Sequence, residues 1–292
     1  MMVKKKEKKK EEKQTELRIA FRMFRRNPLA VAGSVVLILL ILAAIFADFI
    51  TPYYAESQNL MEAFQGPSAL HWFGTDEFGR DIYSRVIYGT RQSLLIGFTS
   101  IAIAVAAGCF IGLISGYYQG ALGSFLMRVM DIIMAIPSML FAIAIVAALG
   151  SNLRNLLIAI AFSRIPIYAR LMRSSVVSVK QMEYVTAAKV MGVSDKKIIL
   201  EDILPNSLSP IIVQATLGVA FAILTAAGMS FLGLGIQPPT PEWGNMISVA
   251  KTYIREYPHM TIFPGAAIMI TILSLNLMGD GLRDALDPKM RY

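Results

Sequence analysis

The chain has 292 residues, 55% of them hydrophobic and only 16% charged, whereas ordinary soluble domains carry roughly 25% charged residues. This composition indicates a membrane protein, and the net charge of +8 does not indicate nucleic-acid binding because seven lysines are confined to residues 4–13. The single cysteine, Cys109, excludes an internal disulfide, and two distant histidines without HExxH or CxxC spacing predict no metal site.

The first 27 residues divide into two segments. Residues 1–15 are expected to form a charged, disordered cytoplasmic tail, since the run at 4–13 mixes both charge signs without apolar side chains. Residues 16–27 place Leu17, Phe21 and Phe24 on one helical face and arginines on the others. This pattern predicts an amphipathic helix in the cytoplasmic membrane interface, with simple positive-charge anchoring as the alternative.

Six apolar segments are long enough to span a bilayer, which needs about 20 mostly apolar residues. The first span, assigned to residues 28–50, follows a capping Asn27 and a proline at its first helical position. The sequence therefore predicts an all-α polytopic membrane protein with six transmembrane helices. The other five spans are expected near residues 94–115, 132–150, 153 to beyond Pro166, 208–231 and 261–279.

The distribution of positive charge orients these spans. Residues 1–28 hold 11 Lys and Arg, and residues 170–206 hold six more. By the positive-inside bias both termini, including the tail 283–292, are predicted to be cytoplasmic. The loop 51–91 is then extracytoplasmic, and residues 92–282 form a five-helix core with a cytoplasmic loop at 183–206.

The stretch "FGTDEFGRD", residues 73–81, resembles a phosphate-binding loop in its glycine spacing alone. Such a loop needs a lysine and a hydroxyl residue after its last glycine, where this chain has Arg80 and Asp81. The predicted extracytoplasmic position also lacks ATP. We expect Asp76, Arg80 and Asp81 to form local ion pairs or caps, with Gly74 and Gly79 in tight turns.

Two features lie within the predicted spans. Small residues recur every four positions in the second span, which favours close helix packing; they are Ala104, Gly108, Gly112 and Gly116. Arg164 lies roughly 16 Å into the fourth span at 1.5 Å per residue. An intramembrane charge faces a partner or a water-filled cavity, so Arg164 either lines a pathway or pairs with carbonyls freed by Pro166 or with another subunit.

The largest predicted cytoplasmic segment, "EYVTAAKVMGVSDKKIILEDILPN", mixes charged and apolar residues. Gly192 is placed to end a first short helix in a left-handed conformation. Ser194 is placed to cap a second helix, where the carboxylate of Asp195 suits the N-terminal dipole. Pro205 marks the return toward the membrane. Two short amphipathic helices joined stiffly to spans form a docking element.

The same segment resembles the EAA loop of importer-type ABC transporter permeases, with the pattern E-A-A-x3-G-x9-I-x-L-P. Thr186 and Asp202 depart from the pattern, and the residues on it are Ala187, Ala188, Gly192, Leu204 and Pro205. Three further segments, "FGTDEFGRDIYSRVIYGTRQSL", "SFLGLGIQPPTPEWGNM" and "GDGLRDALDPKMR", extend the likeness from about residue 20 to 292. Together they resemble C-type permeases of dipeptide/oligopeptide and nickel importers.

The resemblance implies a subunit of an ATP-driven importer in a prokaryotic inner membrane. It implies a second related permease as heterodimer partner, two cytoplasmic ATPase subunits that hold ATP and Mg, and an extracytoplasmic peptide-binding protein. Membrane lipid is the remaining partner, and no catalytic residue, cofactor or nucleic acid is expected in this chain. Residues 194–202 would be the coupling helix, with Ser194, Asp195, Lys196 and Ile199 among its ATPase-coupling residues.

Several alternatives remain open at this point. The Pro-rich stretch around Trp243, with Trp243 available at the membrane interface, is expected to contact the binding protein, to shape the external gate or to serve the structure alone. Asp76, Arg80 and Asp81 are expected either to serve the structure or to contact the binding protein. Nickel or another small solute is an alternative cargo. An ion-driven carrier is a different class, but it usually has paired membrane acids, and Asp48 and Asp131 are expected at the ends of spans.

Overall fold

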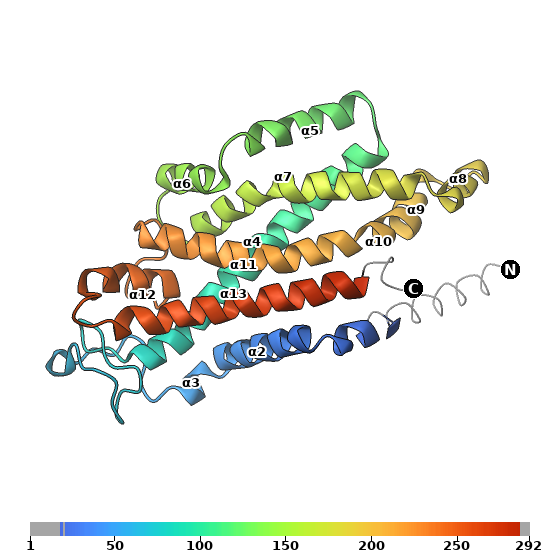
Figure 1. Cartoon of the computed structure of the whole chain (residues 1–292). Helices are drawn as coiled ribbons and strands as arrows, with labels where there is room; N and C mark the ends of the chain where they lie inside the picture. Colours follow the sequence, from blue (N-terminus) through green and yellow to red (C-terminus); the bar gives the residue numbers. More distant parts are fainter. Residues whose placement is uncertain (1–17, 20, 287–292) are drawn as a thin grey trace.

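The computed structural model describes residues 18, 19 and 21–286, and within them the chain is a bundle of long helices (Figure 1). Five helices are long and apolar enough to cross a membrane, and a bent pair raises the number to six if it counts as one span. This agrees with the predicted all-α polytopic fold. The five are α2 (Pro28–Ile45), α4 (Ile82–Tyr117), α7 (Leu153–Lys180), α11 (Ser209–Phe231) and α13 (His259–Leu286).

The start of the first span is formed as predicted. Asn27 accepts hydrogen bonds from the backbone N–H groups of Leu29 and Ala30 at 3.1 and 3.2 Å, and Pro28 occupies the first helical position. A short helix, α3 (Ala47–Ile50), follows α2 almost directly. Before the cap, residues 18, 19 and 21–26 are helical, whereas the predicted tail at 1–15 lies outside the described residues.

The second span is longer than the sequence pattern indicated. Its helix α4 has 36 residues, about 54 Å at 1.5 Å per residue, and starts at Ile82. The predicted extracytoplasmic loop 51–91 is therefore wrong at its C-terminal end, where residues 82–91 are helical. Asp81 fixes this start by accepting a hydrogen bond from the Ser84 N–H at 2.7 Å.

Close packing of α4 on α7 forms the centre of the bundle. A Cβ added at Gly112 would lie 2.4 Å from the Ala169 carbonyl oxygen, and one at Gly108 would lie 2.6 Å from Tyr168 Cβ. Because real Cβ atoms do not approach so closely, only glycine permits this distance between the helices. The small-residue stripe predicted from the sequence is thus confirmed as a packing feature.

The third predicted span, 132–150, is corrected by the structure. This region forms two helices, α5 (Ala121–Met134) and α6 (Ser138–Leu149), that meet at an angle of 86°. Pro137 lies at the break, where it lacks an N–H and disfavours helical geometry for the residue before it. The α5–α6 pair lies on α7 at one edge of the bundle, opposite α2 (Figure 1).

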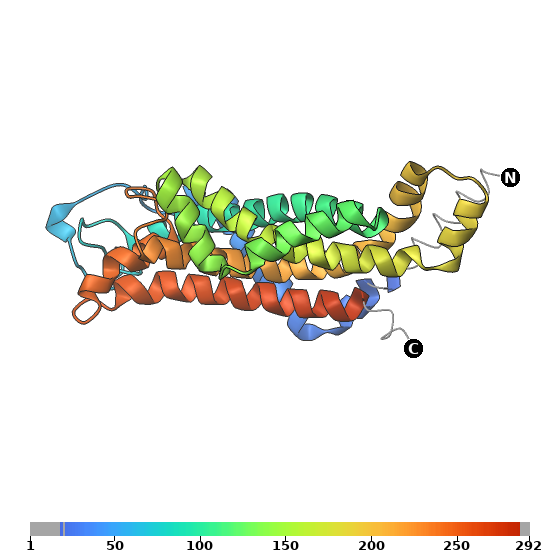
Figure 2. The same cartoon turned by 90° about the horizontal axis from the view of Figure 1, so that it is seen from above.

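The connecting segments gather at opposite ends of the bundle. At one end lie α8 (Glu183–Val190), α9 (Asp195–Ile198) and α10 (Leu204–Ser207), turned away from the long helices in the second view (Figure 2). At the other end lie α3, α12 (Trp243–Ala250) and the segment between α3 and α4 (Figure 1). The two predicted functional regions, the 183–206 loop and the 51–81 segment, are therefore separated by the length of the bundle.

Candidate functional site

The loop 183–206 begins with α8, which ends in a glycine-dependent cap. Gly192 has φ +74°, and its N–H donates to the Lys189 carbonyl at 2.9 Å. The Val193 N–H donates to the Ala188 carbonyl at 3.1 Å. This pair of bonds is a Schellman cap, which needs a left-handed residue at the position of Gly192. The left-handed helix end predicted at this glycine is confirmed.

The second half of the loop returns the chain to the membrane. Ser194 occupies the N-cap position of α9, as expected, but its side chain makes no capping hydrogen bond. Residues Ile199–Ile203 then form a π-helical turn, in which the Leu204 N–H donates to the Ile199 carbonyl. Pro205 follows directly, and because it has no N–H it is suited to this shift of hydrogen-bond register.

Burial divides the predicted coupling residues into two groups. Ala188 is buried, and Ile199, Leu204 and Pro205 are half-buried, so this group anchors the loop to the bundle. The other group is exposed, comprising Ala187, Gly192, Ser194, Asp195 and Lys196. Large apolar side chains are exposed beside them, namely Met182, Tyr184, Val190, Met191 and Leu200. A loop with a buried anchor and an exposed apolar surface fits a docking element.

Sequence reasoning missed the residue that joins this loop to the central helices. Tyr117, the last residue of α4, is buried, and its hydroxyl donates to the Asp195 carboxylate at the start of α9. Its carbonyl oxygen accepts a hydrogen bond from Lys180 Nζ at 2.7 Å. The Lys180 and Lys189 ammonium groups also lie 5.2 and 5.1 Å from the centre of its ring. Tyr117 thus connects α4, α7, α8 and α9.

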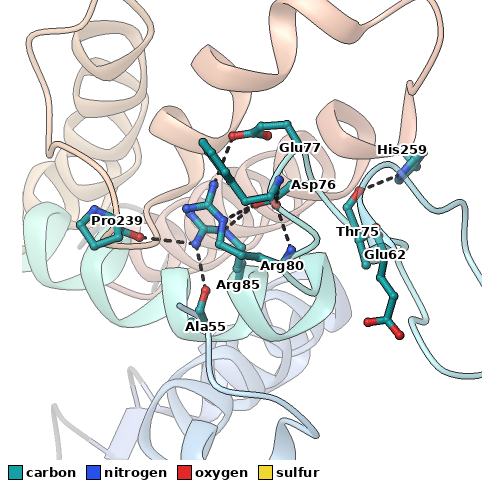
Figure 3. Close-up of polar contacts among 10 residues, drawn as sticks. Ala55, Glu62, Thr75, Asp76, Glu77, Arg80, Arg85, Pro239 and His259 are labelled. Atoms are coloured by element: carbon teal, nitrogen blue, oxygen red, sulfur yellow. Dashed lines mark hydrogen bonds and ion pairs between the residues drawn. The ribbon is translucent and has the colours of Figure 1, made fainter. Parts of the chain in front are cut away.

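At the opposite end of the bundle, a buried polar cluster closes the 51–81 segment onto α4 (Figure 3). Asp76 pairs with Arg80 at 2.6 Å and lies 3.6 Å from Arg85 Nε. Arg85 donates to the carbonyl oxygens of Ala55 at 2.9 Å and Pro239 at 3.4 Å. The ion pair expected within "FGTDEFGRD" is therefore formed, and Arg85 extends it to two other segments.

Two neighbouring acids complete this cluster. Asp81 caps α4 and also contacts His71 Nδ1 at 2.9 Å. Glu77 accepts from Arg80 Nη2 at 3.2 Å, and burial, reinforced by the adjacent Asp76 carboxylate, raises the pKa of the Glu77 carboxyl. Gly74 and Gly79 have φ values of +78° and +70°, as expected for tight turns. The stretch is a structural brace rather than a phosphate loop.

The expected position of Trp243 at the membrane interface is corrected by the structure. Its side chain is fully buried, and its indole N–H donates to the Val86 carbonyl at 3.0 Å. Glu242 caps the helix that Trp243 begins. Asp76, Arg80 and Asp81 are buried as well, so in this conformation these side chains hold the structure together and present no surface to a binding protein.

Arg164 lies in the middle of α7, where its guanidinium is 4.9 Å from the centre of the Phe221 ring on α11. Within the described residues it has no hydrogen-bonded or ion-paired partner. Pairing of Arg164 with carbonyls freed by Pro166, one of the three possibilities considered above, is therefore absent from this conformation.

The described part of the chain contains no group of three or more His, Cys, Asp or Glu side chains placed to hold a metal ion. Its distinctive parts are a bundle of membrane-spanning helices and a stiff docking loop at one end. These parts define a multi-pass membrane protein with an exposed, partly apolar loop at one end of its bundle. The class is a transport permease.

The chain belongs to the family described as binding-protein-dependent transport system inner membrane component, whose model matches residues 108–292. Residues 15–67 match the N-terminal transmembrane domain of oligopeptide transport permease C. It is accordingly a multi-pass permease subunit of a bacterial ABC importer, as the sequence resemblance implied.

Curated relatives cover almost the whole chain. The dipeptide transport system permease protein DppC of Alkalihalophilus pseudofirmus is 50% identical over 94% of this chain and 90% of its own length. The glutathione transport system permease protein GsiD of Pectobacterium atrosepticum is 44% identical over 95% and 93%. A solved chain of the inward-facing MetNI methionine ABC transporter shares the fold, with a TM-score of 0.59 and 16% identity over 70% of this chain and 98% of its own.

Proposed function

We propose that this permease imports short peptides and forms half of the translocation pathway. The observation that carries the proposal is the 50% identity to a dipeptide permease along nearly the whole length of both chains. A second relative bears the name of a glutathione permease, and glutathione is itself a small peptide. The exposed charged groups of Asp131 and Arg170 suit a cargo with charged ends.

Two cytoplasmic ATPase subunits supply the energy, and ATP and Mg are held there rather than in this chain. One of them receives the exposed side of the 183–206 loop, where apolar side chains such as Val190, Met191 and Leu200 surround charged ones. Closure of the ATPase pair moves the loop, and the buried anchor transmits this movement to α4 and α7. The strength of this transmission is measured by the coupling free energy between the ATPase contact and the membrane helices. A flexible connection between the loop and the helices would reduce that coupling.

A second, related permease completes the pathway as a heterodimer partner. Its contact surface includes the α5–α6 edge, where large apolar side chains are exposed; they are Phe125, Ile132, Met134, Ile136, Met139 and Leu140. Both termini and the 183–206 loop face the cytoplasm, and an external binding protein delivers cargo at the other end of the bundle. Arg164 lines the pathway near the middle of α7 and meets polar groups of the peptide.

Reconstitution of the purified complex tests this proposal. With the binding protein outside and ATP inside proteoliposomes, we expect a labelled dipeptide to accumulate, and we expect no accumulation when ATP or the ATPases are left out. Uptake of nickel without uptake of peptide would favour the alternative cargo. Uptake by this chain alone, driven by an ion gradient, would overturn the importer mechanism.

A further inference from the structure

An exposed ion pair joins the two helices beside the break in the third span. Asp131 on α5 accepts a hydrogen bond from Arg170 on α7 at 2.7 Å. The two side chains nevertheless remain 50% and 56% exposed. Each group therefore keeps free hydrogen-bonding capacity toward the space outside this chain, because a carboxylate accepts and a guanidinium donates several bonds.

The pair is deep within its helices. Arg170 lies about 5 Å from the midpoint of α7 and Arg164 about 4 Å from it, at 1.5 Å per residue. Asp131 is three residues before the end of α5, where the chain breaks toward α6. If α7 is centred in the bilayer, whose hydrocarbon core is about 30 Å thick, the pair lies within the hydrocarbon region.

Exposed charge at this depth restricts what lies outside it. Charged side chains in spans face a bundle interior or a water-filled cavity, because hydrocarbon lipid does not solvate them. Irregular backbone at membrane depth obeys the same rule, and the chain is irregular at residues 135–137 next to the pair. Both features therefore indicate that protein or a polar space, rather than lipid, borders α5 and α7 here.

We propose that the Asp131–Arg170 pair lines the inner half of the translocation pathway and binds the charged ends of the transported peptide. The inference rests on the proposed function. Asp131 takes the peptide ammonium group, and Arg170 takes its carboxylate, for which the planar guanidinium fork is suited. A zwitterionic peptide can exchange partners with the pair without leaving either protein charge unpaired, so the exchange avoids the cost of an isolated charge.

The first test compares peptides with free and blocked ends in the reconstituted complex. Wild-type protein should take up a free dipeptide faster than its N-acetylated or C-amidated form. Asp131→Asn should reduce the preference for the free dipeptide over the N-acetylated form about tenfold, because a charge-assisted hydrogen bond to the ammonium group is lost. Arg170→Gln should reduce the preference for the free dipeptide over the C-amidated form by a similar factor. The binding protein is the same in every assay, so a change in these ratios belongs to the permease.

If the Asp131–Arg170 ion pair only holds α5 against α7, the result is different. Its loss would slow every peptide alike and leave both ratios unchanged, which would overturn the inference. If the wild-type complex takes up no peptide at all, the proposed function itself fails. The two failures are therefore distinguishable.

A second test measures access of water to the pair and does not depend on selectivity. In a Cys109→Ser background, Arg170→Cys should react with a charged thiosulfonate reagent, and transported dipeptide should slow that reaction. Leu39→Cys is the matched control, because Leu39 is 58% exposed near the middle of α2 at the opposite edge of the bundle. The proposal would be contradicted if the dipeptide slowed the reaction equally at positions 170 and 39. It would also be contradicted if the dipeptide did not slow the reaction at position 170.

Discussion

Replacing Gly192 with valine should lower ATP-driven peptide uptake about tenfold while the complex still assembles. The left-handed conformation at φ +74° costs a residue with a Cβ about 1–2 kcal/mol, and a β-branched residue is strained further. That strain opposes the Schellman cap that fixes the angle between α8 and α9. A loop with a loosened angle would transmit less of the ATPase movement, so basal ATPase activity should persist while its stimulation by loaded binding protein falls.

Gly192→Asn is the matched control for this prediction. Asparagine tolerates the left-handed region, and a Cβ at this position meets no atom within 4 Å, so neither variant is limited by space. The asparagine variant should therefore keep most of the uptake. Wild-type uptake in Gly192→Val would refute the role of the cap, and equal loss in both variants would show that its backbone conformation is not the cause.

Removing the Tyr117 hydroxyl should uncouple ATP hydrolysis from uptake. Tyr117→Phe deletes the hydrogen bond to Asp195 but keeps the ring that Lys180 and Lys189 contact. A hydrogen bond to a charged group contributes about 1.5–3 kcal/mol, so the bonded arrangement should become at least about tenfold less favoured. We expect the amount of peptide carried per ATP hydrolysed to fall several-fold, measured in proteoliposomes with equal amounts of complex.

Tyr118→Phe is the matched control, because Tyr118 is the next residue in the chain. Tyr118 is 47% exposed, and its hydroxyl makes no hydrogen bond to another described residue. Its loss should leave the ratio of transport to ATP hydrolysis unchanged. If Tyr117→Phe leaves the ratio of transport to ATP hydrolysis unchanged, as Tyr118→Phe should, the hydrogen bond from Tyr117 to Asp195 does not couple the loop to α4.

Local backbone signals made much of this structure predictable. Asn27 before Pro28, Gly192 between two amphipathic segments, and the small-residue stripe of the second span each act through residues close in sequence or through a single helix face. Composition alone indicated the membrane class, because a helix that crosses the hydrocarbon core needs a run of mostly apolar residues. The EAA-like spacing placed the 183–206 loop between the fourth and fifth spans, and the structure has this loop between α7 and α11.

The features that were missed depend on contacts between segments distant in sequence. Trp243 looks like an interfacial residue by type, but α4 packs against it and its indole N–H bonds to Val86. Tyr117 becomes a joint only because Asp195, 78 residues further along, returns to the end of α4. The break at Pro137 was ambiguous, because proline in a span can kink a helix or end it, and hydropathy alone does not distinguish the two.

We propose that the 183–206 loop is the part of this chain on which the ATPase acts. A photocrosslinker attached at Lys196→Cys in the Cys109→Ser background tests it most directly, with Leu70→Cys as the control because Leu70 is 68% exposed at the other end of the bundle. We expect a cross-link to an ATPase subunit from position 196 and none from position 70. A complex in which position 196 yields no ATPase cross-link, or in which position 70 yields one, would contradict it.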